Sequence, residues 1–267
     1  MDLRQQFRAL HAKPFVIPNP WDAGSARLFA SLGFSALATT SSGFAATLGR
    51  RDGRVTRHEA LVHGTAIAEA TPLPVSADLE AGFGDAPEAV AETIARASAT
   101  PLAGCSIEDW SGGANPRLYP RELAVERIRA AVESARRDAS PLVLTARCEN
   151  HIRRNPDLAD TIARLQAYQE AGADVLFAPG LVSADDIATV VGSVDRPVNV
   201  LMGRAGQGID VARLAALGVK RVSVGSGLAR VALGAFLRAA REVRERGTFE
   251  FGAEAIPYAD INALFER

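Results

Sequence analysis

The chain has 267 residues, of which 48% are hydrophobic and 23% charged, with 30 basic and 31 acidic side chains. This length and composition are typical of one ordinary soluble domain. A net charge of −1 lacks the basic excess used to bind nucleic acid or anionic membranes, so we expect neither as a partner. The charged N-terminus argues against a signal peptide, and no apolar run is long enough to span a membrane, so we expect a cytoplasmic protein.

Lysine and cysteine are scarce, which limits the chemistry available. Lys13 and Lys220 are the only lysines, and all other basic side chains are arginines, which cannot form a Schiff base with a carbonyl substrate. Cys105 and Cys148 lie in apolar runs without metal-ligand spacing, and we interpret them as small buried hydrophobes. No GxSxG nucleophile elbow is present. Imine catalysis, a zinc site and a serine hydrolase are therefore not expected.

Short apolar runs alternate with helical patterns eight times along the chain. The predicted strands cover residues 15–19, 36–40, 74–80, 103–109, 142–149, 174–179, 197–202 and 221–225. The predicted helices cover residues 22–32, 58–70, 87–99, 121–137, 158–171, 184–194, 210–217 and 227–245. Segment 1–13 has the pattern of an amphipathic helix, and residues 248–267 form a tail that ends in a short helical piece at 260–265.

Eight βα units in about 250 residues are typical of a TIM barrel. A doubly wound sheet of this length has fewer strands and a glycine-rich dinucleotide turn, whereas the first turn here reads NPWDAGSAR. We therefore predict one α/β domain over residues 1–267, a TIM (β/α)8 barrel. Its N-terminal helix, 1–13, closes the bottom of the barrel, the barrel covers about 14–247 and the tail about 248–267.

Active sites of this fold lie at the carboxyl ends of the strands, and three carboxylates occur there. Asp78 and Glu80 are two residues apart and face the same side of the third strand, and Glu108 ends the fourth. Like charges at this spacing are relieved by a hard divalent cation, so the pattern favours a Mg²⁺ or Mn²⁺ site. Ion pairs between ordinary rim carboxylates and the many arginines explain the same pattern equally well.

Other strand ends carry groups suited to binding an anion. The turn Ser41-Ser42-Gly43 offers hydroxyls and backbone N–H groups to a carboxylate or phosphate oxygen, although such turns also occur as simple helix caps. Arg147 ends the fifth strand and fits either a bidentate grip on a substrate carboxylate or a buried ion pair. Glu149 shares its face, as a group near the metal or as the partner of Arg147.

Three further features complete the candidate site. Asn199, near the end of the seventh strand, is a candidate substrate ligand. His151 lies close to a strand end and is a candidate base, although a polar loop residue is the simpler interpretation. Loop 110–120, WSGGANPRLYP, is long enough to act as a lid over the catalytic face.

An ordered set of motifs in this sequence resembles the isocitrate lyase/phosphoenolpyruvate mutase superfamily. The motifs are PNPWDAGSARL, TTSSGFAATLGRRD, DLEAGFGD, SIED and TARCEN, and the resemblance runs from about residue 15 to about 249. It implies a TIM barrel whose last helix is swapped between subunits, in a dimer or a dimer of dimers. It also implies Mg²⁺-dependent making or breaking of C–C or P–C bonds through the enolate of a 2-oxo acid.

The resemblance also suggests roles for individual residues. It implies four metal-site carboxylates, Asp52, Asp78, Glu80 and Glu108, with Glu80 at a position where the family more often has aspartate. It places the substrate's carboxylate or 2-oxo end at the turn of Ser42 and Gly43, and it matches Arg147 to the arginine of the family's A-R strand.

One motif of the family's lyases is missing. Their loop after I-E-D carries a K-K-C-G-H motif with the catalytic cysteine, whereas loop 110–120 here has no Lys, Cys or His. The candidates for proton transfer are then Tyr119, Glu149, His151 or a metal-bound water.

The sequence predicts a Mg²⁺-dependent carbon–carbon lyase of the isocitrate-lyase type. Its expected substrate is a small di- or tricarboxylic hydroxy or oxo acid, cleaved through a metal-stabilised enolate. The alternatives are a phosphoenolpyruvate mutase or phosphonate-type enzyme, an oxaloacetate-cleaving enzyme, or a catalytically idle protein that binds 2-oxo acids.

Overall fold

The computed structural model describes residues 2–112, 115–203 and 207–266, and in them eight parallel strands form one sheet in the order β1-β8-β7-β6-β5-β4-β3-β2. The strands are β1 (Phe15–Ile17), β2 (Leu37–Ala38), β3 (Val75–Asp78), β4 (Gly104–Glu108), β5 (Val143–Arg147), β6 (Val175–Phe177), β7 (Val198–Leu201) and β8 (Arg221–Ser223). The helices are α1 (Leu3–Leu10), α2 (Ala23–Ser31), α3 (Ser41–Thr47), α4 (Arg57–Glu69), α5 (Pro87–Ser98), α6 (Arg121–Ala135), α7 (Leu158–Glu170), α8 (Ala184–Gly192), α9 (Val211–Ala216), α10 (Gly227–Arg246) and α11 (Tyr258–Phe265), with a 3₁₀ helix, η1, at Glu250–Glu254.

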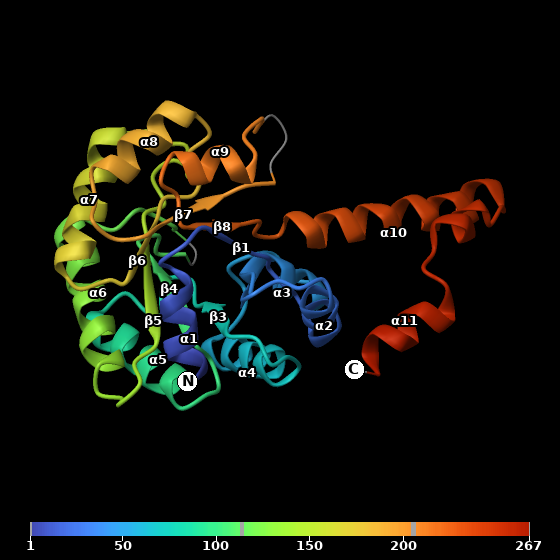
Figure 1. Cartoon of the computed structure of the whole chain (residues 1–267), viewed down its shortest axis with the longest axis horizontal. Coiled ribbons are helices and arrows are strands. Elements are labelled where there is room, and N and C mark those ends of the chain that lie inside the picture. Colours follow the sequence, from blue (N-terminus) through green and yellow to red (C-terminus); the bar gives the residue numbers. More distant parts are fainter. Residues whose placement is uncertain (1, 113–114, 204–206, 267) are drawn as a thin grey trace.

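The sheet curls into a nearly closed barrel with helices around it (Figure 1). Between β1 and β2, at the open edge, the amide of Ala38 donates to the Pro18 carbonyl at 3.0 Å. The Asn19 side chain adds a second link, because its Nδ2 donates to the Thr39 carbonyl at 3.2 Å. The predicted TIM barrel is therefore confirmed, with every strand inside its predicted segment.

The helices begin and end where local chemistry favours it. Asp157 caps α7 by accepting from the Asp160 amide at 2.9 Å, and Pro87 occupies the first turn of α5, where its missing N–H costs nothing. Gly172 follows α7 with φ of +101°, a conformation that other residues rarely adopt. These signals are local, which explains why the sequence predicted the helices well.

Two segments differ from the predicted elements. Residues 41–43, expected as a turn, are the first residues of the short helix α3, which is capped by the Thr40 side chain. The last helix begins at Tyr258 instead of residue 260, after a 3₁₀ turn that the sequence did not predict. Both are short pieces whose patterns are too brief to show helical periodicity.

Helix α1 closes the end of the barrel away from the strand carboxyl ends. Phe7 is fully buried in a small apolar cluster that includes Val143 and Val175, at the starts of β5 and β6. His11, which follows α1, receives a contact from Arg221 inside the barrel, with 3.3 Å between the Arg221 Nη1 and His11 Nε2 atoms. The His11 Nδ1 lies 2.9 Å from the Phe7 carbonyl, so Nδ1 carries the proton and Nε2 accepts.

Helix α10 projects away from the barrel instead of packing along it (Figure 1). Of its 20 residues, all described, Ala229 alone is buried, while apolar side chains such as Val231 and Phe236 are exposed. Helix α11 turns back to α2, where Arg27 Nη1 donates to the Phe265 carbonyl at 3.0 Å. In the described residues, no helix combines the length and apolar character needed to cross a bilayer.

The burial of His11 makes stability depend on pH. Burial, and then the charge of Arg221, lower the pKa of His11 from 6.5 to about 3. The unfolded chain therefore binds more protons between these two values, and the free energy of unfolding falls as the pH drops through that window. The slope is at most about 1.4 kcal/mol per pH unit.

We expect His11→Gln to flatten this dependence, measured by urea unfolding at several pH values between 4 and 7.5. His58→Gln, on the exposed face of α4, is the matched control and should leave the dependence unchanged. The interpretation is wrong if His11→Gln unfolds with the same pH dependence as the unmodified protein.

Candidate active site

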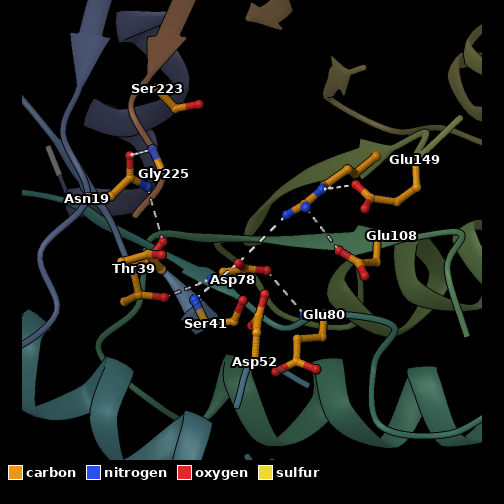
Figure 2. A network of polar contacts seen from close by, with 12 residues as sticks. Asn19, Thr39, Ser41, Asp52, Asp78, Glu80, Glu108, Glu149, Ser223 and Gly225 are labelled. Carbon is orange, nitrogen blue, oxygen red and sulfur yellow. Dashed lines mark hydrogen bonds and ion pairs between the residues drawn. The ribbon is translucent and has the colours of Figure 1, made fainter. Parts of the chain in front are cut away.

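Asp78, at the end of β3, is fixed through its own backbone amide and through two backbone amides that donate to its carboxylate. The Asp78 amide donates to Thr39 Oγ1 at 2.9 Å, which joins the ends of β2 and β3. Its Oδ1 accepts from the Glu80 amide at 3.2 Å, and its Oδ2 accepts from the Ser41 amide at 3.3 Å (Figure 2). These contacts orient the carboxylate at the strand-end rim before any ligand binds.

Glu80 has a backbone conformation that is unusual for a residue other than glycine. Its φ is +47°, in the left-handed region, and Gly82 follows with φ of +76°. Such a conformation costs roughly 1–3 kcal/mol and persists only where the surroundings impose it. The sharp turn places the Glu80 carboxylate beside Asp52 and Asp78 at the same rim (Figure 2).

The crowded carboxyl groups hold their protons more tightly than usual. Burial, followed by the charges of Asp78 and Asp52, raises the pKa of Glu80 to about 8. Packing around the Asp52 carboxyl and the charge of Asp78 raise the pKa of Asp52. Burial and the nearby charge of Glu149 raise the pKa of Glu108 well above its usual range. This rim therefore has an excess of negative charge that a cation would relieve.

Arg147, at the end of β5, is surrounded by these carboxylates. Its Nε donates to Glu149, its Nη2 lies 3.3 Å from Glu108 Oε2, and its Nη1 lies 3.7 Å from Asp78 Oδ2 (Figure 2). Carboxylates on three sides raise the pKa of Arg147 well above its usual value. The ion pair is therefore present, and the grip on a substrate carboxylate, the other interpretation of Arg147, stays a prediction.

A second arginine, Arg153, supports the same carboxylates. Its Nε donates to Glu149 Oε2 at 2.9 Å, and its Nη2 lies 3.5 Å from Glu108 Oε1. The guanidinium also lies over the Trp110 ring, 4.8 Å from its centroid. Arg153 was not singled out from the sequence, although its position four residues after Glu149 is the spacing of an ion pair on one helical turn.

Two adjoining cavities open beside this cluster, and both are lined by Ser41, Asp52 and Arg147. The lumen cavity, of about 190 Å³, reaches into the barrel, where Ser76, Ser106, Asn199, Arg221 and Ser223 line it. The rim cavity, of about 430 Å³, is lined at the mouth by Arg51, Arg54, Glu80, Glu108, Trp110 and Arg153. Cavities of this size and polarity suit a small, strongly polar ligand.

The structure brings most of the predicted residues together. The lumen and rim cavities are lined by eight of them, namely Ser41, Ser42, Asp52, Asp78, Glu80, Glu108, Arg147 and Asn199. Glu149 is fully buried behind them and contacts the site through Arg147 and Arg153. Glu149 therefore holds the guanidinium groups of Arg147 and Arg153 in place and does not face either cavity.

Besides Glu149, three predicted residues do not line either cavity. The Gly43 amide donates to Thr40 Oγ1 at 3.3 Å, and a Cβ at Gly43 would lie 2.5 Å from Thr40 Cγ2, so close packing at the start of α3 explains this glycine. Tyr119 is 1% exposed and donates its hydroxyl to Asp85 at 2.6 Å, away from the cavities. The His151 Nε2 is buried and has no hydrogen-bond partner in the described residues.

The candidate lid folds back on itself at its base. Trp110 and Leu118 form an antiparallel bridge, and the Tyr119 amide donates to the Asp109 carbonyl at 2.8 Å. This return turns Tyr119 into the barrel wall and leaves Trp110 at the rim cavity. Residues 113–114 of the predicted lid lie outside the described residues.

The donor set fits a hard divalent cation in its chemistry. In the residues that the structure describes, no three His, Cys, Asp or Glu side chains form a metal-binding group by themselves. Mg²⁺ needs no such group, because it takes one or two carboxylates directly and keeps several waters. Asp78 and Glu80, with Asp52 and Glu108 nearby, offer only oxygen ligands. The raised pKa values of Glu80, Asp52 and Glu108 are the expected result of buried and crowded carboxyl groups.

The barrel and its acidic strand-end site define a class of TIM-barrel proteins with polar active sites on the βα loops. The family model for phosphoenolpyruvate phosphomutase matches residues 7–244. A solved structure of a candidate lyase/mutase from Burkholderia cenocepacia J2315 is 56% identical, with a TM-score of 0.95 over 99% of this chain and 96% of that one. The chain belongs to the phosphoenolpyruvate phosphomutase family, within the isocitrate lyase/phosphoenolpyruvate mutase superfamily.

Relatives with named activities point to bond cleavage. The 2-methylisocitrate lyase of Halalkalibacterium halodurans is 29% identical over 98% of this chain and 92% of its own length. The oxaloacetate decarboxylase of Chromohalobacter salexigens is 30% identical over 96% of this chain and 90% of its own. The comparisons support a carbon–carbon lyase.

Substitution of Asp78 tests the site directly. Asp78→Asn keeps the shape of the side chain but removes the negative charge, so we expect it to fold normally and to lose its thermal shift with Mg²⁺. Activity on any substrate of the unmodified protein should fall by about a hundredfold or more. Asp85→Asn, on the loop that follows β3 and outside both cavities, is the matched control. A Mg²⁺-dependent shift retained in Asp78→Asn would contradict the assignment.

Proposed function

We propose that this protein is a metal-dependent carbon–carbon lyase acting on a small di- or tricarboxylic hydroxy or oxo acid. The observation that carries this proposal is the convergence of Asp52, Asp78, Glu80 and Glu108 around Arg147, beside two polar cavities. Family membership and the two named relatives support the same reaction class.

The acidic rim would hold Mg²⁺ or Mn²⁺ through Asp78 and Glu80, with Asp52 and Glu108 close enough to bind its waters. A cation held there would supply electrostatic stabilisation for the negative charge that develops on a 2-oxo oxygen during cleavage. The Asp78 carboxylate is already oriented by the Ser41 and Glu80 amides, so little reorganisation is needed when the site is filled.

The remaining groups would bind and orient the substrate. Ser41 and Ser42 line the lumen cavity, and Arg147 lines both cavities. Arg147 is held by the fully buried Glu149, so its guanidinium keeps a fixed direction while it attracts a substrate carboxylate. Trp110 and Arg153 form the wall of the rim cavity that would limit the entry of water.

Rearrangement of a phosphoryl or phosphonate group is the second candidate function. Such chemistry needs several cations around the transferred group, and loop 110–120 offers only Arg117. The rim cavity nevertheless gathers four arginines from other segments, Arg51, Arg54, Arg147 and Arg153. These arginines, beside the carboxylates of Asp52, Glu80 and Glu108 in the same cavity, favour a phosphate-bearing substrate more than the sequence suggested.

The first experiment is a substrate panel with purified protein, in Mg²⁺ and in EDTA. We expect isocitrate, methylisocitrate, a malate derivative or oxaloacetate to release glyoxylate, pyruvate or CO₂, with all release abolished by EDTA. Turnover that persists in EDTA would overturn the metal dependence.

The alternative functions have their own tests. Incubation with phosphoenolpyruvate, followed by phosphorus NMR, tests the mutase activity. Binding of 2-oxo acids without any turnover would indicate an idle binding protein. A cytoplasmic location of the protein stays a prediction, because this assay does not address it.

We also propose that the chain assembles as a dimer or a dimer of dimers through α10. This helix leaves its own barrel and exposes apolar side chains along its length, including Val231, Leu233, Phe236 and Leu237. Several exposed large apolar side chains on one helix are typical of a protein interface. Its extension away from the barrel matches the expectation that the last helix packs against a partner.

Substitution on α10 tests this assembly. Phe236→Glu places a charge in the expected interface, so light scattering should show a smaller species than the unmodified protein. Val182→Glu, on an exposed loop residue away from α10, should not change the mass. A monomeric unmodified protein, or a Phe236→Glu variant of unchanged mass, would contradict the proposal.

A further inference from the structure

Arg221 is a buried arginine inside the barrel, at the start of β8, with 5% of its surface exposed. Its Nε donates to Asn199 Oδ1 at 2.9 Å, and its Nη2 donates to Thr145 Oγ1 at 2.9 Å. Its Nη1 lies 3.3 Å from His11 Nε2. All three partners are uncharged, because burial keeps His11 neutral at physiological pH.

The charge of Arg221 is not balanced by the protein around it. Arg221 forms no ion pair with any Asp or Glu among the described residues, whereas Arg147 forms ion pairs with three. Burial lowers the pKa of Arg221 to about 9, so the guanidinium remains charged at neutral pH. A buried charge without a counter-charge is strongly unfavourable, and a bound anion would relieve it.

The Arg221 guanidinium has N–H groups that are not used in hydrogen bonds, and the residue lines the lumen cavity. An arginine has five N–H groups, and three are used, which leaves one on each terminal nitrogen. Arg221 and Ser223 both line the lumen cavity. Ser223 accepts from Asn199 Nδ2 at 2.9 Å, so its own hydroxyl hydrogen remains available as a donor. Two arginine donors and one hydroxyl suit the two oxygens of a carboxylate.

Arg221 lies deeper in the barrel than Arg147, and both line the same cavity. Its partner Thr145 lies two residues before Arg147 on β5, which corresponds to a separation of about 7 Å along the strand. Both arginines line the same lumen cavity. A short dicarboxylic acid can therefore extend from the rim toward the floor of this cavity.

We propose that Arg221 and Ser223 form a carboxylate-binding site at the floor of the lumen cavity, which receives the substrate carboxylate remote from the acidic rim. This inference rests on the proposed function. It makes Arg221 a specificity-determining residue that favours dicarboxylic over monocarboxylic acids, because a monocarboxylate held at the rim leaves the buried guanidinium without a counter-charge.

Calorimetric binding in Mg²⁺ tests this site without requiring turnover. The probes are succinate and malonate, with propionate as the monocarboxylate of similar size. We expect the unmodified protein to bind a dicarboxylate at least tenfold more tightly than propionate. Arg221→Met should remove that preference and leave propionate binding unchanged, and Arg8→Met, which removes an exposed arginine outside the barrel, should have no effect.

A second variant keeps the test decisive if Arg221→Met does not fold. Ser223→Ala removes one donor while the three contacts of Arg221 remain, and it should weaken succinate binding severalfold without changing propionate binding. The inference is overturned if neither dicarboxylate is preferred, if a foldable variant weakens all three probes equally, or if chloride alone binds. Absence of lyase turnover with the dicarboxylate preference intact would instead overturn only the proposed function.

Discussion

The site depends on like-charged carboxylates being forced together at one edge of the barrel. Parallel strands bring all their carboxyl ends to one rim, so Asp78 on β3 and Glu108 on β4 become neighbours simply because they end adjacent strands. Arg147 and Arg153 offset part of this repulsion. Burial, and then the charges of Asp78 and Asp52, raise the pKa of Glu80 to about 8, as expected where the repulsion is only partly offset. That imbalance supports the cation site proposed at this rim.

The strand ends could be predicted from the sequence because their position follows from fold class alone. Once eight strands are recognised, the residues that end them are neighbours at the rim, and Asp78, Glu108 and Arg147 follow. The direction of a loop side chain does not follow in this way. Tyr119 was a reasonable candidate in a catalytic-face loop, but the backbone return at Asp109 turns it toward Asp85.

Contacts between segments far apart in the chain also could not be predicted from the sequence. Arg221 meets Thr145, which is 76 residues away, and His11, which is 210 residues away, and no local pattern links these positions. Gly43 is a case in which the local sequence suggested a ligand-binding turn. In the structure, close packing against Thr40 is sufficient to explain why a glycine is needed there. Local patterns identified the elements, and the three-dimensional contacts decided which side chains face the cavities.

The polar interior of this barrel separates the groups that stabilise the fold from those that bind. TIM-barrel interiors are usually filled by branched apolar side chains, which contribute to stability. Here Ser76, Ser106, Asn199 and Ser223 occupy interior positions and line a cavity. The apolar contribution must then come from the layer between strands and helices, where residues such as Ile94, Ile107 and Leu165 are fully buried. Because large residues of that layer, such as Ile94, Ile107 and Leu165, do not line the lumen cavity, their packing is independent of the polar side chains there and offsets the cost of burying an unbalanced arginine.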